Sequence, residues 1–185
     1  MKVTPPSKHL NECRNERIAN LAWVIDSALT EIEHPQTLDL CCGESLFADS
    51  HRSRSYTGVD ADEGIIESNR ERWPLQYWVC APIGDVIGQL AEIDYDLLIS
   101  TGCDDDAGRG NVSDLVRAVR LVIESSRPKF IFLEHACSVA SVTYAWALRE
   151  LPGMGYRSAR SEGYVCASCV PRWALREWVL WERET

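Results

Sequence analysis

The chain has 185 residues and a mass of 20.9 kDa, a size that fits one compact domain. Its apolar fraction of 45% and charged fraction of 25% are those of globular proteins, which excludes disordered, collagen-like and coiled-coil chains. The 28 acidic and 19 basic residues give a formal net charge of -9. The summed field therefore repels polyanions, which excludes a nucleic-acid binder that works mainly by counterion release.

The sequence predicts no membrane segment and no disulfide scaffold. Apolar runs stay short of the roughly 18 residues that a membrane helix needs, and the N-terminal residues lack the apolar stretch of a signal peptide. We therefore expect a cytoplasmic protein without a membrane partner. Eight cysteines are present, but a domain of this length does not need covalent cross-links, so we expect reduced thiols.

Short apolar runs alternate with longer amphipathic runs along the chain, which predicts an α/β fold with a mostly parallel sheet. The predicted helices span residues 15–32, 64–72, 85–90, 113–125 and 139–151, with Ser113 as an N-cap. The predicted strands span residues 37–41, 56–60, 76–80, 95–100 and 129–134, and two last strands, at about 156–168 and 174–182, form an antiparallel hairpin. We expect a single domain, with an N-terminal helical segment over residues 1–35 and a Rossmann-like core over residues 36–185.

The first predicted strand ends in an Asp-x-x-x-Gly turn formed by Asp39 and Gly43, where glycine lets a ligand approach the backbone. The second ends at Asp60, which comes 21 residues after Asp39, about where doubly wound folds present an acid to ribose hydroxyls. Together they indicate a nucleoside-containing cofactor. The alternative is that Gly43 only makes a tight turn and Asp60 only caps the next helix.

A dinucleotide is disfavoured, because Glu44 follows the single glycine of this turn and repels a pyrophosphate. The chain here resembles the class I S-adenosylmethionine (SAM) dependent methyltransferases, whose first motif is an acid, three other residues and a glycine. That resemblance implies SAM as cofactor and a seven-stranded, mostly parallel sheet with a reversed last strand. It assigns the methionine part to the turn, the ribose to Asp60 and the adenine amine to Asp85. The implied cofactor-binding residues are Asp39, Cys41, Gly43, Ser45, Leu46, Asp60, Ala61, Asp85 and Ser100.

Several segments further resemble the cytosine-C5 methyltransferases, in that family's order and over most of residues 37–183. Leu38 to Ser45 is similar to the family's Asp-Leu-Phe-Cys-Gly motif, and Gly84-Asp85-Val86 to its Gly-Asp-Ile motif. Asp96 to Cys103 is similar to the strand that delivers the nucleophilic cysteine, and Arg127 to Ala136 to the Arg-Pro-x…Glu-Asn-Val strand. Val170-Pro171-Arg172, followed by Arg176, is similar to the Val-Pro-Gln…Arg pattern.

This second resemblance implies methylation of a cytosine-type base in a nucleic acid or nucleotide. Cytosine C5 is a poor nucleophile. A thiolate added at C6, together with a carboxylic acid hydrogen-bonded to N3, makes C5 carbanion-like toward the sulfonium methyl group. The implied nucleophile is Cys103 and the implied N3 partner is Glu134. Arg172 and Arg176 would fix the base or a phosphate with their donor forks.

The sequence departs from the cytosine-C5 pattern at several of these motifs. The Pro-Pro before Cys103 is missing, the Asn after Glu134 is His135, and three consecutive acids at residues 104–106 lie where a DNA backbone approaches. No stretch is left for a target-recognition domain. These departures argue against autonomous sequence-specific DNA methylation. They leave open a partner chain or homodimer, a small molecule, RNA or protein acceptor methylated without a thiol adduct, and a non-catalytic SAM-binding regulator.

Cys166 and Cys169 have the Cys-x-x-Cys spacing of half a zinc site, but no second paired ligand set is evident nearby. The pair also lies in a predicted strand, whereas thioredoxin-like redox pairs open a helix. We therefore predict no metal site and interpret these thiols as buried and inert.

Overall fold

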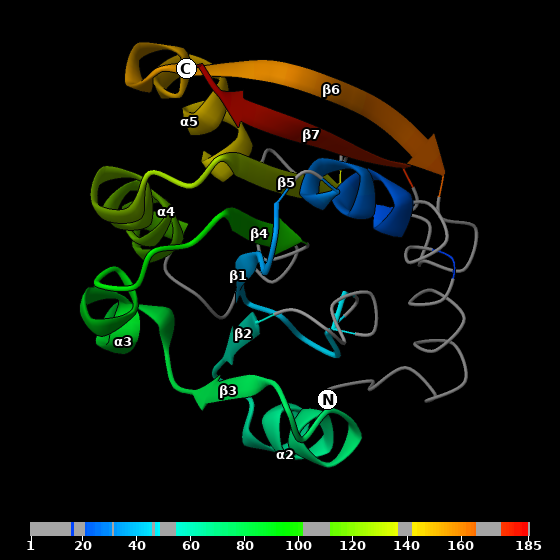
Figure 1. The fold of residues 1–185 in the computed structure, drawn as a ribbon. Coiled ribbons are helices and arrows are strands. Elements are labelled where there is room, and N and C mark those ends of the chain that lie inside the picture. Colours follow the sequence, from blue (N-terminus) through cyan, green and yellow to red (C-terminus); the bar gives the residue numbers. More distant parts are fainter. Residues whose placement is uncertain are drawn as a thin grey trace, which may run out of the picture.

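A computed structural model of the chain describes residues 16, 21–30, 32–45, 47–48, 55–101, 112–136, 142–165 and 175–184. The described strands form one seven-stranded sheet in the order β3-β2-β1-β4-β5-β7-β6 (Figure 1). These strands are β1 (Gln36–Leu40), β2 (Ser55–Asp60), β3 (Tyr77–Cys80), β4 (Leu97–Thr101), β5 (Phe130–Ala136), β6 (Tyr156–Val165) and β7 (Leu175–Arg183).

The first five strands are parallel, and β7 is inserted antiparallel between β5 and β6. The chain runs outward from β1 through β2 to β3, then returns to place β4 on the other side of β1. This reversal makes the carboxyl ends of β1 and β4 the topological switch point, where open α/β sheets bind their ligands.

Helices cover both faces of the sheet (Figure 1). They are α2 (Glu63–Arg72), α3 (Ile83–Leu90), α4 (Val112–Ser126), α5 (Val142–Glu150) and a further helix over residues 21–29. Helix α4 packs between α3 and α5 and closes one apolar core, which includes Leu40, Leu98 and Leu133. The helix at 21–29 and α2 contribute to the second core, which includes Phe132 and Trp178.

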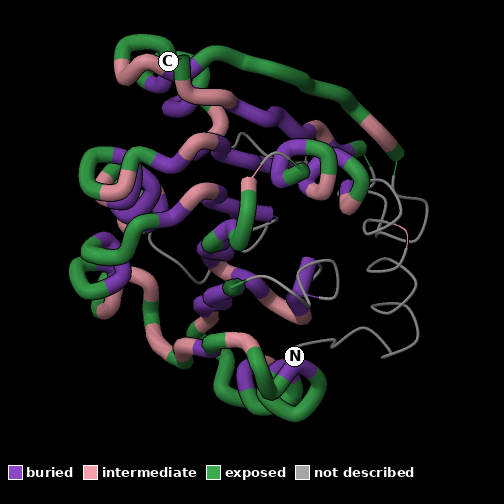
Figure 2. The backbone as a smooth tube through the Cα atoms, viewed as in Figure 1, coloured by how far each residue is buried: buried purple, intermediate pink, exposed green. Residues whose placement is uncertain are grey.

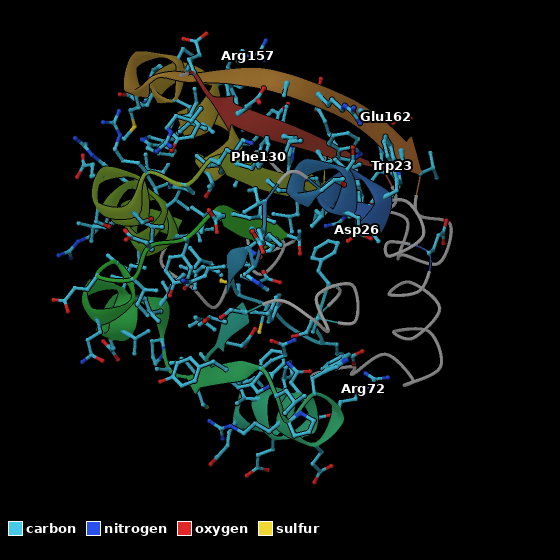
Figure 3. All side chains as sticks on the ribbon, in the orientation of Figure 1. Trp23, Asp26, Arg72, Phe130, Arg157 and Glu162 are labelled. Atoms are coloured by element: carbon cyan, nitrogen blue, oxygen red, sulfur yellow. The ribbon has the colours of Figure 1, made fainter. Side chains whose placement is uncertain are left out.

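The two cores explain why the strands carry nearly continuous apolar sequence. All five residues of β4 are buried, because helices cover both sides of this central strand. Burial falls off at the edge strand β6, where seven successive residues from Arg157 are exposed (Figure 2). Trp23 lies near Glu162 below this edge (Figure 3), with its ring centroid 6.4 Å from that of Trp178.

The structure confirms the predicted fold class, with a seven-stranded, mostly parallel sheet and an antiparallel last strand. One local prediction is wrong: α4 begins at Val112, so Ser113 lies inside the first turn and is not the N-cap. Another difference is that β5 continues to Ala136, because pairing with β7 extends it by two residues beyond the predicted end. Among the described residues, no helix is long and apolar enough to cross a bilayer.

Candidate cofactor site

The turn after β1 adopts an unusual backbone. Cys41, Gly43 and Ser45 have positive φ angles of 57°, 51° and 52°. Glycine adopts this left-handed region freely, but a residue with a Cβ atom does so at a cost of about 1–3 kcal/mol that surrounding contacts must offset. The turn is therefore a conformation imposed by its neighbours.

Backbone and carboxylate contacts tie this turn to the end of β2. The Cys42 N–H donates to the carbonyl oxygen of Val59 at 2.9 Å. The Gly43 N–H donates to Oδ2 of Asp60 at 3.0 Å, and the Asp62 N–H donates to Oδ1 at 3.0 Å. Each carboxylate oxygen can accept more than one hydrogen bond, so the half-buried Asp60 can still accept from two vicinal hydroxyls.

Asp39 supports the turn from inside the sheet. Its side chain is buried, and the Tyr56 hydroxyl donates to Oδ2 at 2.6 Å. Burial, followed by the nearby Asp39 charge, raises the pKa of Tyr56 well above its ordinary value. Burial, with the charges of Asp39 and Asp60, likewise raises the pKa of Cys42, which therefore stays a thiol at neutral pH. Asp39 thus acts beneath the turn rather than at its surface.

A residue from α2 completes the enclosure of the turn. The amide nitrogen of Asn69 donates to the Gly43 carbonyl oxygen at 2.8 Å and to the Ser45 hydroxyl at 3.0 Å. The Ser45 hydroxyl also acts on the side chains of Cys42 and Tyr56, where it lowers the pKa of each against the larger effect of burial. Ser45 therefore joins the buried polar groups below the turn to α2 beside it.

The remaining described cofactor candidates lie around the same edge of the sheet. Ala61 is exposed directly after β2, and Asp85 is exposed in the first turn of α3, which follows β3. Ser100 is buried in β4 opposite Leu40. The predicted residues thus follow the carboxyl ends of β1, β2 and β3, and Ser100 lies within the sheet in β4.

The two described residues assigned to base recognition lie at the same edge, on β5 and β7, which are two and three strands from β1. Glu134 on β5 and Arg176 on β7 form a buried, bidentate ion pair in which Nε and Nη2 of Arg176 donate to Oε1 and Oε2. The Tyr164 hydroxyl, from β6, donates to Oε1 at 2.8 Å. The structure therefore brings Glu134 and Arg176 together, with both carboxylate oxygens already engaged.

On the opposite face of β5, His135 belongs to a second polar cluster. Its ring packs against the Tyr144 ring of α5 with centroids 4.2 Å apart and the two planes tilted by 41°, and its Nε2 lies 3.9 Å from Oε2 of Glu177. The Tyr144 hydroxyl donates to Oε1 of Glu177 at 2.7 Å. These contacts hold His135 between β7 and α5.

Several predicted residues lie outside the described part of the chain. These are Leu46, Cys103, Arg172 and the pair Cys166 and Cys169. Of the described cysteines, Cys42 and Cys80 are free thiols, as expected. Cys41 is the exception: it is disulfide-bonded, and its partner is not among the described residues. The expectation of reduced thiols is therefore wrong at Cys41.

Sequence reasoning missed three polar residues that hold these sites together: Tyr56, Asn69 and Tyr164. A signal existed for Asn69, because it lies between Ile66 and Trp73 on the buried face of an amphipathic helix. Tyr56 and Tyr164 gave no such signal, because tyrosine is common in strands and its hydroxyl partner is fixed only by the fold.

No family model and no curated protein matches the sequence. Comparison with solved structures supports the architecture. Among solved structures, magnesium protoporphyrin IX methyltransferase (ChlM) from Synechocystis PCC 6803 with bound SAM matches with a TM-score of 0.66 at 12% identity, over 99% of this chain and 87% of that one. A TehB-like SAM-dependent methyltransferase from Corynebacterium glutamicum matches with a TM-score of 0.64 at 16% identity, over 97% and 100%.

A third similar structure contains S-adenosyl-L-homocysteine. It is the Pyrococcus abyssi tRNA (uracil-54, C5)-methyltransferase, with a TM-score of 0.56 at 18% identity, over 90% of this chain and 38% of that one. At these identities the likeness concerns the fold. The strand order, the reversed β7 and these three structures together establish that the chain has the Rossmann-like fold of the class I SAM-dependent methyltransferases.

Proposed function

We propose that the protein binds SAM at the carboxyl ends of β1 and β2 and transfers its methyl group to an acceptor. The observation that carries this proposal is the link between the left-handed turn and Asp60, in which one carboxylate holds the Gly43 amide while staying half-exposed at the carboxyl end of β2. Solved structures of the same fold contain SAM or S-adenosyl-L-homocysteine, which supports the choice of cofactor.

The chemistry of these residues fits SAM better than a dinucleotide. Asp60 offers acceptors for a ribose diol, and the exposed Asp85 offers one for an adenine amine. Glu44 adds a negative charge in the turn, which disfavours a phosphate but not a cofactor that carries a positive sulfonium. When bound, SAM supplies a methyl group activated by that sulfonium. The turn and Asp60 hold and orient the cofactor, so that an acceptor can approach from the edge at β4 and β5.

A cytosine-type base is our first candidate acceptor. It is favoured by the meeting of Glu134 and Arg176, the two described residues assigned to base recognition, beside the end of β4. The similarity in fold to a uracil-C5 methyltransferase adds support for pyrimidine chemistry. In this proposal the Cys103 thiolate adds to C6 across the C5–C6 double bond, while Glu134 in its protonated form exchanges one of its present partners for N3 of the base. C5 then takes the methyl group, and loss of the C5 proton expels the thiolate and restores the double bond.

A second candidate is an acceptor that needs no thiol adduct, such as a small molecule, RNA or protein. The occupied carboxylate of Glu134 favours it, because Arg176 and Tyr164 already use both oxygens. A third is SAM binding without turnover, in a regulatory role.

Product analysis separates these candidates. The protein is incubated with methyl-labelled SAM and deoxycytidine, a cytosine-containing oligonucleotide or a bulk RNA preparation, and labelled products are identified by mass spectrometry. A methyl on cytosine C5 that disappears in Cys103→Ser supports the first candidate. A methyl on nitrogen or oxygen, or full activity in Cys103→Ser, contradicts it. Cofactor binding without any transfer favours the regulatory role.

A further inference from the structure

Asn69 is a buried amide on α2 that no motif of the sequence singles out. It lies on the face of the helix that also carries the buried Ile66, and it is 1% exposed. Its side-chain nitrogen donates two hydrogen bonds to the turn after β1, at 2.8 Å to the Gly43 carbonyl and 3.0 Å to the Ser45 hydroxyl. The two hydrogens of one amide group therefore serve two points of the same turn.

These two points enclose the part of the turn that is costly to form. Ser45 holds a φ of 52° although it has a Cβ atom, and Gly43 holds a φ of 51°. Both Gly43 contacts matter here, because its N–H is bound by Asp60 and its carbonyl by Asn69. The Gly43 amide thus binds a residue of β2, and the Gly43 carbonyl binds a residue of α2.

We infer that Asn69 is a positioning residue for the cofactor, which preorganises the turn so that its backbone meets SAM without rearrangement. The inference rests on the proposed function, because it assigns a role within the same site. Without Asn69 the turn loses two restraints and populates other conformations, and binding must then select the competent one, which lowers the apparent affinity.

A purely structural role makes a different prediction. If Asn69 only helped α2 to pack, its removal would lower the stability of the fold and leave the cofactor affinity unchanged. Helix propensity does not confuse the comparison, since alanine is a better helix former than asparagine. Ile66→Val is the matched control, because it removes one methyl group from the same buried face of α2 and leaves both hydrogen bonds from Asn69 to the turn in place.

The experiment measures SAM binding by calorimetry and stability by urea unfolding for the full chain and both variants. We expect Asn69→Ala to weaken SAM binding about tenfold, and Ile66→Val to lower stability while its dissociation constant stays within about twofold of wild type. If Asn69→Ala does not fold, Asn69→Leu, which has a similar volume and removes both donors without adding a charge, replaces it with the same expectation. A dissociation constant within about twofold of wild type in the folded Asn69 variant overturns the inference.

The Asn69→Ala substitution in a Ser45→Gly protein tests whether Asn69 acts by holding the turn in its left-handed conformation. In Ser45→Gly the left-handed conformation no longer carries the cost of a Cβ atom, so Asn69→Ala should weaken binding less, by about threefold or below. An undiminished tenfold loss in that background contradicts preorganisation through Ser45. Absence of SAM binding by the wild-type chain is a distinct result, because it removes the proposed function itself and this inference with it.

Discussion

At the residue scale, the hydrogen bond from Tyr56 to the buried Asp39 contributes to the stability of the sheet beneath the turn. Tyr56→Phe keeps the ring but removes a donor to a carboxylate inside the sheet, which should cost about 1.5–3 kcal/mol. Urea unfolding measures this loss, with Tyr77→Phe as control, since Tyr77 is 62% exposed and should change stability by less than about 0.5 kcal/mol. Equal effects of the two substitutions would contradict the assignment.

Buried tyrosines also set the response to alkaline pH. Burial raises the pKa of Tyr95 and of Tyr156 to about 12. A raised pKa in the folded state favours the protonated form, so this stabilisation is complete below the ordinary pKa of 10 and is lost as the pH rises from there through 12. We expect the free energy of unfolding to fall above about pH 10 and to fall less steeply in Tyr156→Phe. Identical slopes in both proteins would contradict this account.

At the scale of elements, Gly58 sets how closely β2 packs beneath the turn. A Cβ atom there would lie 2.4 Å from Cζ3 of Trp78 and 3.0 Å from Sγ of Cys42. Gly58→Ala should therefore destabilise the protein by about 1–3 kcal/mol through overpacking. Gly88→Ala is the control, and we expect it to stabilise the protein. A Cβ atom at this position in α3 meets nothing within 4 Å, and the better helix propensity of alanine should raise the free energy of unfolding by up to about 1 kcal/mol. Urea unfolding of both variants checks the two signs, and a stable Gly58→Ala protein would refute the close packing.

The ion pair between Glu134 and Arg176 joins β5 to β7. Arg176→Met leaves a buried carboxylate without its cation, which should cost about 3–5 kcal/mol. In the double variant with Glu134→Gln no charge is left uncompensated, so we expect the double substitution to cost clearly less than the sum of the two single ones. Thermal and urea unfolding of the three variants form the cycle. Strict additivity would show that the two groups do not interact in the folded protein.

At the scale of the whole molecule, most of the fold could be predicted because apolar runs alternate with amphipathic ones, and because a last hairpin follows the parallel strands. The turn and Asp60 were also predicted, since both lie directly after strands. The pairing of side chains from different strands and helices could not be predicted. Glu134 and Arg176 are 42 residues apart and were assigned separate tasks, yet they pair. Asn69 meets Gly43 from 26 residues away, and only the packing of α2 decides that contact.

The most direct test of SAM binding at the carboxyl ends of β1 and β2 is a calorimetric titration of the wild-type chain with SAM, beside Asp60→Ala and Asp62→Ala. Asp60 holds the Gly43 amide, whereas Asp62 only caps α2 through the Ile65 N–H at 3.2 Å. We predict binding by the wild type, a loss of about tenfold or more in Asp60→Ala, and a change below about threefold in Asp62→Ala. Absence of binding by the wild type, or equal affinity in Asp60→Ala, would contradict the account.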